Sequence, residues 1–169
     1  MNLQKNILTL SVAALVGFSC SSGNKLTKTQ KSTYGEEQFQ VCSREVAKIK
    51  GDKRYFTGIG EGRSINSQYS KKAAREEARN ELAEKMNVFV RTETKNEEQQ
   101  AEDPTSYAAN RAVVTEQLVS QRLQGLSTFC EKTFRNDEGV YTSFVGVKLD
   151  IEKSHFLKEV KEKLKKEGI

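Results

Sequence analysis

The sequence predicts an α+β fold, in which one long helix packs on a small, mostly antiparallel sheet of four strands and a C-terminal helix completes the domain. Between Ser67 and Met86, small or apolar residues recur at every fourth position, which places them on one face of a helix. Shorter segments alternate apolar and polar residues as strands do, and the last two of these flank a turn sequence.

The length and composition set bounds on this fold. A chain of 169 residues is long enough for one domain with its own core. It is 36% hydrophobic and 30% charged and contains no Trp, so we expect a modest core. We therefore assign residues 39–169 to a single globular domain.

The first nineteen residues are predicted to be an export signal rather than part of this domain. Lys5 precedes an apolar run from Ile7 to Phe18 that ends in small residues, which is typical of a signal peptide. The run is shorter than the roughly 18 to 20 residues that a membrane-spanning helix needs. Residues 1–19 are therefore excluded from the fold.

Cys20 follows this run directly and is predicted to be lipidated. Lipoprotein signal peptidase cuts before a cysteine whose thiol carries diacylglycerol, although Gly17 and Phe18 depart from the strict recognition pattern. Several acyl chains would anchor the protein stably, because one chain alone binds a membrane only marginally. The alternative is ordinary secretion with cleavage nearby.

The other two cysteines are predicted to form a disulfide. The chain has three cysteines, and acylation of Cys20 leaves Cys42 and Cys130 as a pair in an oxidising compartment. Two buried free thiols that act as small apolar side chains are the alternative.

Residues 20–38 are predicted to be the lipidated cysteine and a flexible tether, because they contain almost no apolar side chain beyond Cys20. Removal of the signal also removes Lys5 and leaves 27 basic and 23 acidic residues, a net charge of +4. Both signs are interleaved along the chain. We therefore expect no nucleic-acid partner.

The first half of the domain contains a short apolar alternation over Phe39–Cys42 and a strand over Arg54–Ile59 that ends at Gly60-Glu61-Gly62. A helix is predicted to begin after an N-cap at Ser64 or Ser67 and to end near Met86. Its buried line is expected to consist of Ser70, Ala74, Ala78, Leu82 and Met86.

The middle of the domain is predicted to be a strand, a loop and a helix. Val88–Thr94 alternates in the strand manner, and Lys95–Thr105 is polar enough for a loop. After Pro104, helical spacing predicts a helix, although its Val-Val-Thr centre also suits a strand. The residues at helical spacing are Tyr107, Arg111, Val114 and Leu118.

The last part is predicted to be a hairpin and a helix. Strands over Leu126–Phe134 and Val140–Asp150 are separated by the turn Asn136-Asp137-Glu138-Gly139. Odd-numbered residues of the second strand are expected to face the core. A C-terminal helix over Glu152–Lys166 is expected to dock by one narrow stripe. The stripe consists of Phe156, Val160 and Leu164.

No motif predicts catalysis, a metal site or a cofactor. Gly58 and Gly60 match the first two glycines of a dinucleotide-binding motif. The third glycine position of that motif is occupied by Arg63, so the spacing does not fit a dinucleotide site. His155 is the sole histidine and is expected on the surface. A metal site or a catalytic triad would therefore lack most of the side chains that usually form it. The helical carboxylates are expected to pair with Lys and Arg. They are Glu76, Glu77, Glu81 and Glu84.

The sequence also resembles the lipoprotein-twenty family of small bacterial envelope proteins over residues 54–150. The resemblance rests on Tyr55–Gly62, the spaced Ala74, Ala78 and Leu82, the segment Val88–Val90 and the strand Tyr141–Leu149. It implies a helix on a small antiparallel sheet, no enzymatic activity and an outer-membrane location. In flagellated species it implies association with the flagellar motor or sheath.

These observations predict a non-enzymatic lipoprotein of the cell outer membrane that acts as a structural or interaction module. The expected partners are the membrane through the lipid anchor, envelope proteins or polymers, and a second copy of the chain. The alternative is a lipoprotein that binds a small ligand or a glycan between the long helix and the sheet.

Overall fold

The structure is a computed structural model that describes residues 42–49 and 52–168. Residues 1–41, including Cys20, the predicted signal and most of the predicted tether, lie outside the described part, as do residues 50–51 and 169.

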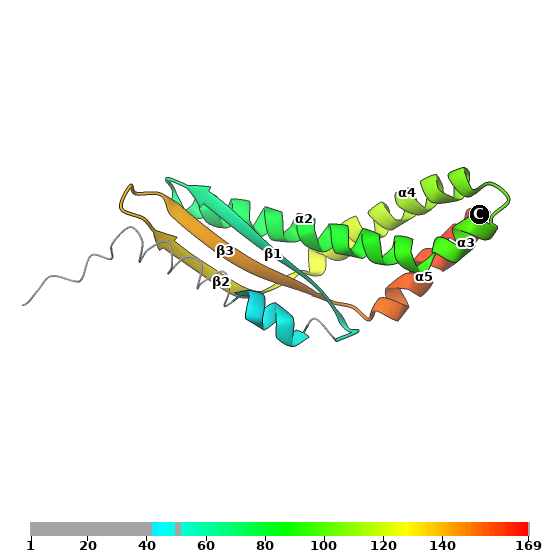
Figure 1. The fold of residues 1–169 in the computed structure, drawn as a ribbon, viewed down its shortest axis with the longest axis horizontal. Coiled ribbons are helices and arrows are strands. Elements are labelled where there is room, and N and C mark those ends of the chain that lie inside the picture. The colour runs from blue at the N-terminus through cyan, green and yellow to red at the C-terminus, as the bar shows by residue number, and fades with distance from the viewer. Residues whose placement is uncertain (1–41, 50–51, 169) are drawn as a thin grey trace, which may run out of the picture.

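The predicted α+β class is confirmed, and the described residues form a sheet of three strands rather than the expected four (Figure 1). The sheet is antiparallel in the order β1-β3-β2. The long helix α2 covers one face of the sheet and continues past it, and α3, α4 and α5 gather around the continuing part. The elements are β1 (Tyr55–Ser64), α2 (Ser67–Glu93), α3 (Lys95–Gln100), α4 (Pro104–Arg122), η1 (Leu123–Gly125), β2 (Ser127–Arg135), β3 (Tyr141–Asp150) and α5 (Lys153–Lys166).

The N-terminus of α2 is capped by Asn66 rather than by Ser64 or Ser67. The Asn66 side chain accepts hydrogen bonds from the backbone N–H groups of Gln68 and Tyr69 at 2.8 and 3.4 Å, which satisfies donors that have no partner within the helix. The predicted buried line is confirmed from Ser70 to Met86, where each member is 0% exposed.

The predicted strand at Val88–Thr94 is wrong, because α2 continues to Glu93. Met86 and Val90 extend the four-residue repeat of the buried line and are 0% and 1% exposed, whereas Val88 is 42% exposed. A short alternation of apolar residues fits both periods. The continuing helical repeat decides between them, because it keeps the apolar face on one side of a single helix.

Three glycines of β1 set the distance between this strand and α2. A Cβ atom added at Gly58, Gly60 or Gly62 would lie 2.0–2.1 Å from a backbone oxygen of α2. Those oxygens belong to Ala78, Ala74 and Ser70, which lie on the buried line of the helix. The prediction that the strand ends at Gly60-Glu61-Gly62 is therefore wrong: β1 continues to Ser64, and its three glycines allow backbone to pack on backbone.

The expected loop at Lys95–Thr105 contains a short helix, α3, before a brief connection to α4. Asp103 caps α4 by accepting from the N–H groups of Thr105 and Ser106 at 3.0 and 3.1 Å, and Pro104 occupies the first turn. The predicted helix after Pro104 is confirmed. Arg111, Val114 and Leu118 are buried, and Tyr107 is half-buried.

The predicted hairpin of β2 and β3 is confirmed. Gly139 adopts a φ of 83°, which favours glycine, and the Asn136 side chain accepts from the Val140 N–H at 2.8 Å. Val145, Val147 and Leu149 face α2 and are at most 5% exposed, whereas Tyr141 is half-buried.

The predicted C-terminal helix is also confirmed. α5 begins at Lys153 after Glu152, and its three stripe residues are 0–2% exposed. Phe156 packs edge-on against Phe56 of β1, with their ring centroids 6.0 Å apart. The stripe therefore belongs to the core that α2, α4 and the sheet share. Its residues are Phe156, Val160 and Leu164.

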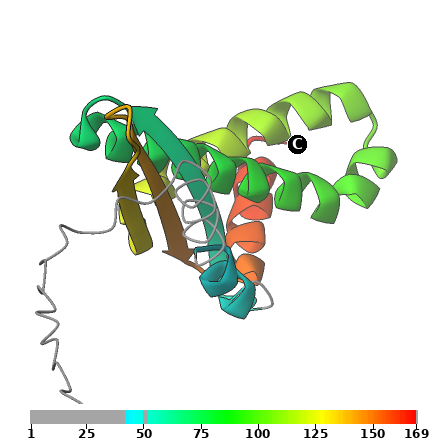
Figure 2. The same cartoon turned by 60° about the vertical axis from the view of Figure 1, so that its left-hand side comes forward.

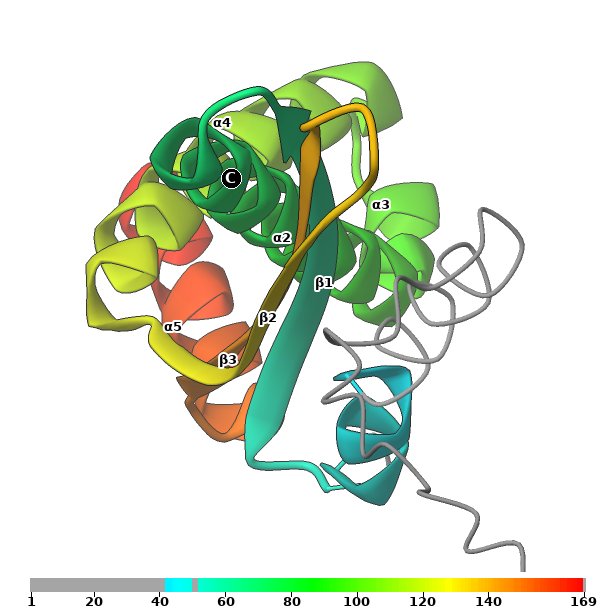
Figure 3. The ribbon, with the colours of Figure 1, turned by 90° about the vertical axis from the view of Figure 1, so that its left-hand side faces the viewer.

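A helix over residues 42–49 lies on the sheet face opposite α2 (Figures 2 and 3). The short apolar alternation over Phe39–Cys42 ends in this helix at Cys42, and its other residues lie outside the described part. A disulfide with an S–S distance of 1.99 Å joins Cys42 to Cys130 of β2, the predicted pairing. Both cysteines are buried with Phe144 in a second apolar cluster.

We expect Gly60→Ala to destabilise the fold severely. The new Cβ would lie 2.1 Å from the Ala74 oxygen and 2.3 Å from the Ala78 nitrogen, so α2 must move away from β1 at a cost of about 3 kcal/mol or more. Urea unfolding followed by circular dichroism measures this loss. Gly125→Ala is the matched control, since its nearest atom is 3.9 Å away; equal stability of the two variants would contradict the close packing.

Reduction of the disulfide is expected to lower the free energy of unfolding by up to about 4 kcal/mol, because the bond restricts a long loop in the unfolded chain. The two cysteines are 88 positions apart in the sequence. Urea unfolding with and without a thiol reductant tests this, and the double variant Cys42→Ser/Cys130→Ser should reproduce the effect. An unchanged midpoint would show that the disulfide does not stabilise the domain.

Candidate functional site

The residues considered for chemistry do not converge on one site. His155 is exposed at the start of α5, as expected. Among Glu76, Glu77, Glu81 and Glu84, the structure records an ion pair for Glu81, with Lys85 at 2.8 Å. Within residues 42–49 and 52–168 no group of three His, Cys, Asp or Glu side chains could hold a metal ion. No helix in these ranges is long and apolar enough to span a membrane.

Three carboxyl or phenol groups have shifted pKa values, and each shift has a local cause. A hydrogen bond from Arg54 lowers the pKa of Asp52 to about 2. A hydrogen bond from Lys71 lowers the pKa of Glu131. Burial, followed by a hydrogen bond to Glu97, raises the pKa of Tyr107. These groups belong to three separate parts of the fold and do not form an acid and base pair.

β1 forms one edge of the sheet, and α2 side chains occupy part of its free side. The Glu81 carboxylate accepts a hydrogen bond from the N–H of Ile59. Lys85 Nζ donates to the carbonyl oxygen of Thr57 at 3.0 Å. Free backbone groups of this kind are what an edge strand offers to another strand. Here the protein's own helix binds them.

β2 forms the other edge and carries two features that disfavour pairing with another strand. Glu131 accepts from Lys71 and Arg75 of α2 at 3.0 and 2.9 Å, and Lys132 is exposed. The register with β3 shifts between Thr128 and Cys130, which marks a bulge. Edge charges and bulges both oppose edge-to-edge association.

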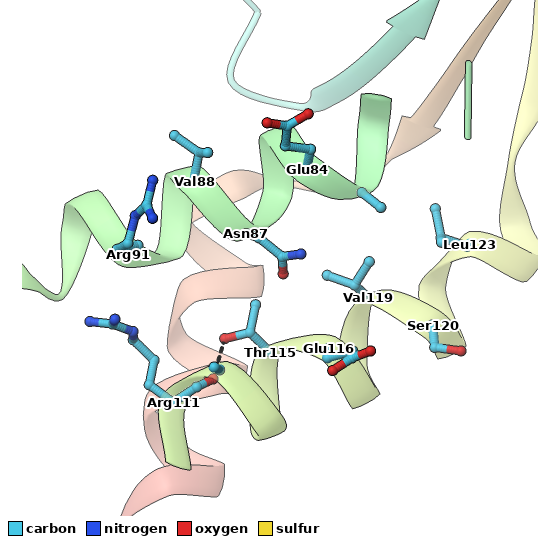
Figure 4. Close-up of a pocket in the computed structure, with 12 residues that line it drawn as sticks. Glu84, Asn87, Val88, Arg91, Arg111, Thr115, Glu116, Val119, Ser120 and Leu123 are labelled. Carbon is cyan, nitrogen blue, oxygen red and sulfur yellow. Dashed lines mark hydrogen bonds between the residues drawn. The ribbon is translucent and has the colours of Figure 1, made fainter. Parts of the chain in front are cut away.

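A groove of about 540 Å³ lies between α2 and α4 (Figure 4). It is lined by α2 and α4 together with Leu123, whereas the predicted ligand position lies between α2 and the sheet. The glycine contacts bring β1 and α2 too close for a cavity there. The apolar lining residues are Ala83, Val88, Ala112, Val119 and Leu123, and the polar ones are Glu84, Asn87, Arg91, Arg111, Thr115, Glu116 and Ser120.

One end of the groove is fixed by a buried ion pair. Arg111 is 7% exposed, and its guanidinium pairs with Glu98 of α3 and donates to Thr94 Oγ1 at 3.4 Å. Removing one partner of such a pair would leave a buried charge uncompensated. Arg91 lies near Arg111 across the groove (Figure 4) and is exposed.

Among the described residues, four large apolar side chains are exposed. Ile65 and Tyr69 lie at the junction of β1 and α2, and Val88 and Val113 lie on α2 and α4. The sequence did not reveal the groove, because Val88 was assigned to a strand. The signal that could have found it is the continued four-residue repeat through Val90, which would have placed Val88 on the outer side of a longer helix.

No family model and no curated protein matches this sequence. The resemblance to the lipoprotein-twenty family therefore rests on the residue patterns of the sequence itself.

The ion pairs of Glu131 lead to a prediction about acid stability. Because the folded state lowers the pKa of Glu131 below its ordinary value of 4.5, its contribution is present above pH 4.5 and is lost as the pH falls through the folded pKa. The group is partly exposed, so the loss should stay under about 1 kcal/mol. Lys71→Ala should raise the Glu131 pKa toward 4.5 in an NMR titration; an unchanged pKa would contradict the assigned cause.

Proposed function

We propose that this protein is a non-enzymatic lipoprotein of a bacterial cell envelope, anchored in the outer membrane through acylated Cys20. In this proposal its folded domain acts as an interaction module and binds through the groove between α2 and α4. The lipid anchor supplies location, and the domain supplies recognition.

The observation that carries the proposal is the bond between Cys42 and Cys130. Disulfides form and persist in oxidising compartments and are rare in the cytosol. The bond supports export of the chain, as does the apolar segment before Cys20. It also uses two of the three cysteines, which leaves Cys20 as the thiol that is available for acylation.

An interaction role is supported by where the described domain remains open. α2 covers one sheet face, the helix over residues 42–49 covers part of the other, and both edges carry protective features. The groove, by contrast, combines exposed apolar side chains with charges of both signs. Such mixed surfaces are typical of protein interfaces.

The second candidate is a small ligand or glycan in the same groove. Its volume of about 540 Å³ falls within the range of ligand pockets, and the exposed Arg91 offers a positive charge to an anionic group of a ligand. Thermal shift measurements with candidate anions and oligosaccharides test this role. Stabilisation that is lost in Arg91→Ala would favour it over protein binding.

Cys20→Ser is expected to abolish labelling with a fatty-acid probe and to release the protein from the membrane or leave an uncut precursor. The described domain begins well after residue 20, so it should still fold. Metabolic labelling and detergent partitioning measure these effects. Cys130→Ser is the control, because it removes a cysteine of the domain and should keep the lipid label. Unchanged membrane attachment of Cys20→Ser, with no fatty-acid label in Cys20→Ser or in Cys130→Ser, would refute the lipoprotein proposal.

A further inference from the structure

We propose that the groove between α2 and α4 binds the same groove of a second copy of this chain and forms a two-fold symmetric dimer. This inference rests on the proposed function as an interaction module and names its partner. It is carried by the order of charges along the two helices.

The two helices carry their charges along the groove in opposite orders. On α2, Glu84 comes first, then Val88 and Arg91, whereas on α4 Arg111 precedes Glu116. α4 returns along α2 in the reverse direction (Figure 1). Both arginines therefore lie in the half of the groove toward α3, and both glutamates lie in the half toward the sheet (Figure 4).

Arg111 is buried and paired with Glu98, so the exposed Arg91 supplies the free positive charge of the basic half. A groove with acidic side chains in one half and this arginine in the other is complementary to itself. A two-fold axis that crosses the helices at right angles reverses their direction, so the acidic half of one copy meets the basic half of the other. Glu84 of each copy then approaches Arg91 of the other. Two-fold dimers use one surface patch twice in this way, and they are the commonest oligomers.

The same axis brings the Val88 side chains of the two copies together. Val88 is 42% exposed and lies between Glu84 and Arg91 of its own helix, close to where the axis passes. Association would bury both copies of Val88 at the centre and leave the charges around them, as in other protein interfaces. Glu84 and Arg91 form no ion pair with another residue of the described part, so their charges are free for a partner.

The other exposed apolar site does not show this pattern. Ile65 and Tyr69 lie at the β1 end of α2, where the nearby Arg63 already pairs with Glu61 at 2.6 Å. It therefore provides the control position for the groove.

Cross-linking in intact cells that produce the full-length chain tests the contact. Val88→Cys adds a thiol close to the proposed axis, and treatment with a short bismaleimide should yield a product of twice the monomer mass. Tyr69→Cys is the matched control, because it is at least as exposed on the same helix and lies far from the axis. Cross-linking of Val88→Cys at or below the level of Tyr69→Cys would overturn the dimer.

Charge reversal gives a second test that a merely structural role would not pass. Glu84→Arg or Arg91→Glu alone sets like charges against each other twice per dimer and should weaken self-association about tenfold or more in sedimentation measurements. The double variant Glu84→Arg/Arg91→Glu should restore it, since both copies change together. Both side chains are exposed, so melting temperatures should stay constant. A double variant as monomeric as the single variants would refute the proposed pairing.

The failure of this inference is distinguishable from failure of the proposed function. A photo-reactive residue at position 88 that captures a different protein, but not a second copy, would overturn the dimer and leave the groove as an interaction surface. Absence of any adduct, together with unchanged membrane attachment of Cys20→Ser, would overturn both.

Discussion

The close approach of β1 to α2 is the constraint on which the rest of the structure depends. Two strand residues span about 6.6 Å and four helix residues about 6.0 Å, so glycines at alternate strand positions meet small residues at every fourth helix position. The nearly equal spacing lets each of the three glycines of β1 lie opposite one residue of the buried line of the helix. Backbone packing of this kind fixes the direction of α2 on the sheet, because a rotated helix would bring larger side chains against the strand.

The fixed direction of α2 explains the second half of the molecule. The helix is 27 residues long, about 40 Å, and extends past the sheet (Figure 1). There its buried line changes from small side chains to Leu82, Met86 and Val90. These larger side chains need an apolar cover where the sheet ends, and α4 and α5 supply it with Val114, Leu118, Phe156 and Val160.

The sequence predicted the parts of this fold that repeat with one clear period. The buried line of α2, the hairpin and the stripe of α5 each follow one period over several residues. The glycines of β1 were misread, because a glycine run that ends a strand and one that allows a helix to approach look the same until the helix is in place. Val88–Thr94 was misread because a segment of seven residues fits two periods. The groove was missed for the same reason, since it exists only if α2 continues past Met86.

The charge pattern of the groove illustrates a property that neither helix has alone. Glu84 and Arg91 on one helix and Glu116 on the other are exposed charged residues, of a kind that makes up 30% of the chain, and Arg111 is buried in its pair with Glu98. They become an acidic half and a basic half only because the α3 corner, held by Arg111 and Glu98, turns α4 back along α2. The same corner also sets the distance between α2 and α4. The buried ion pair of Arg111 and Glu98 therefore contributes both to the shape of the groove and to the arrangement of its charged side chains.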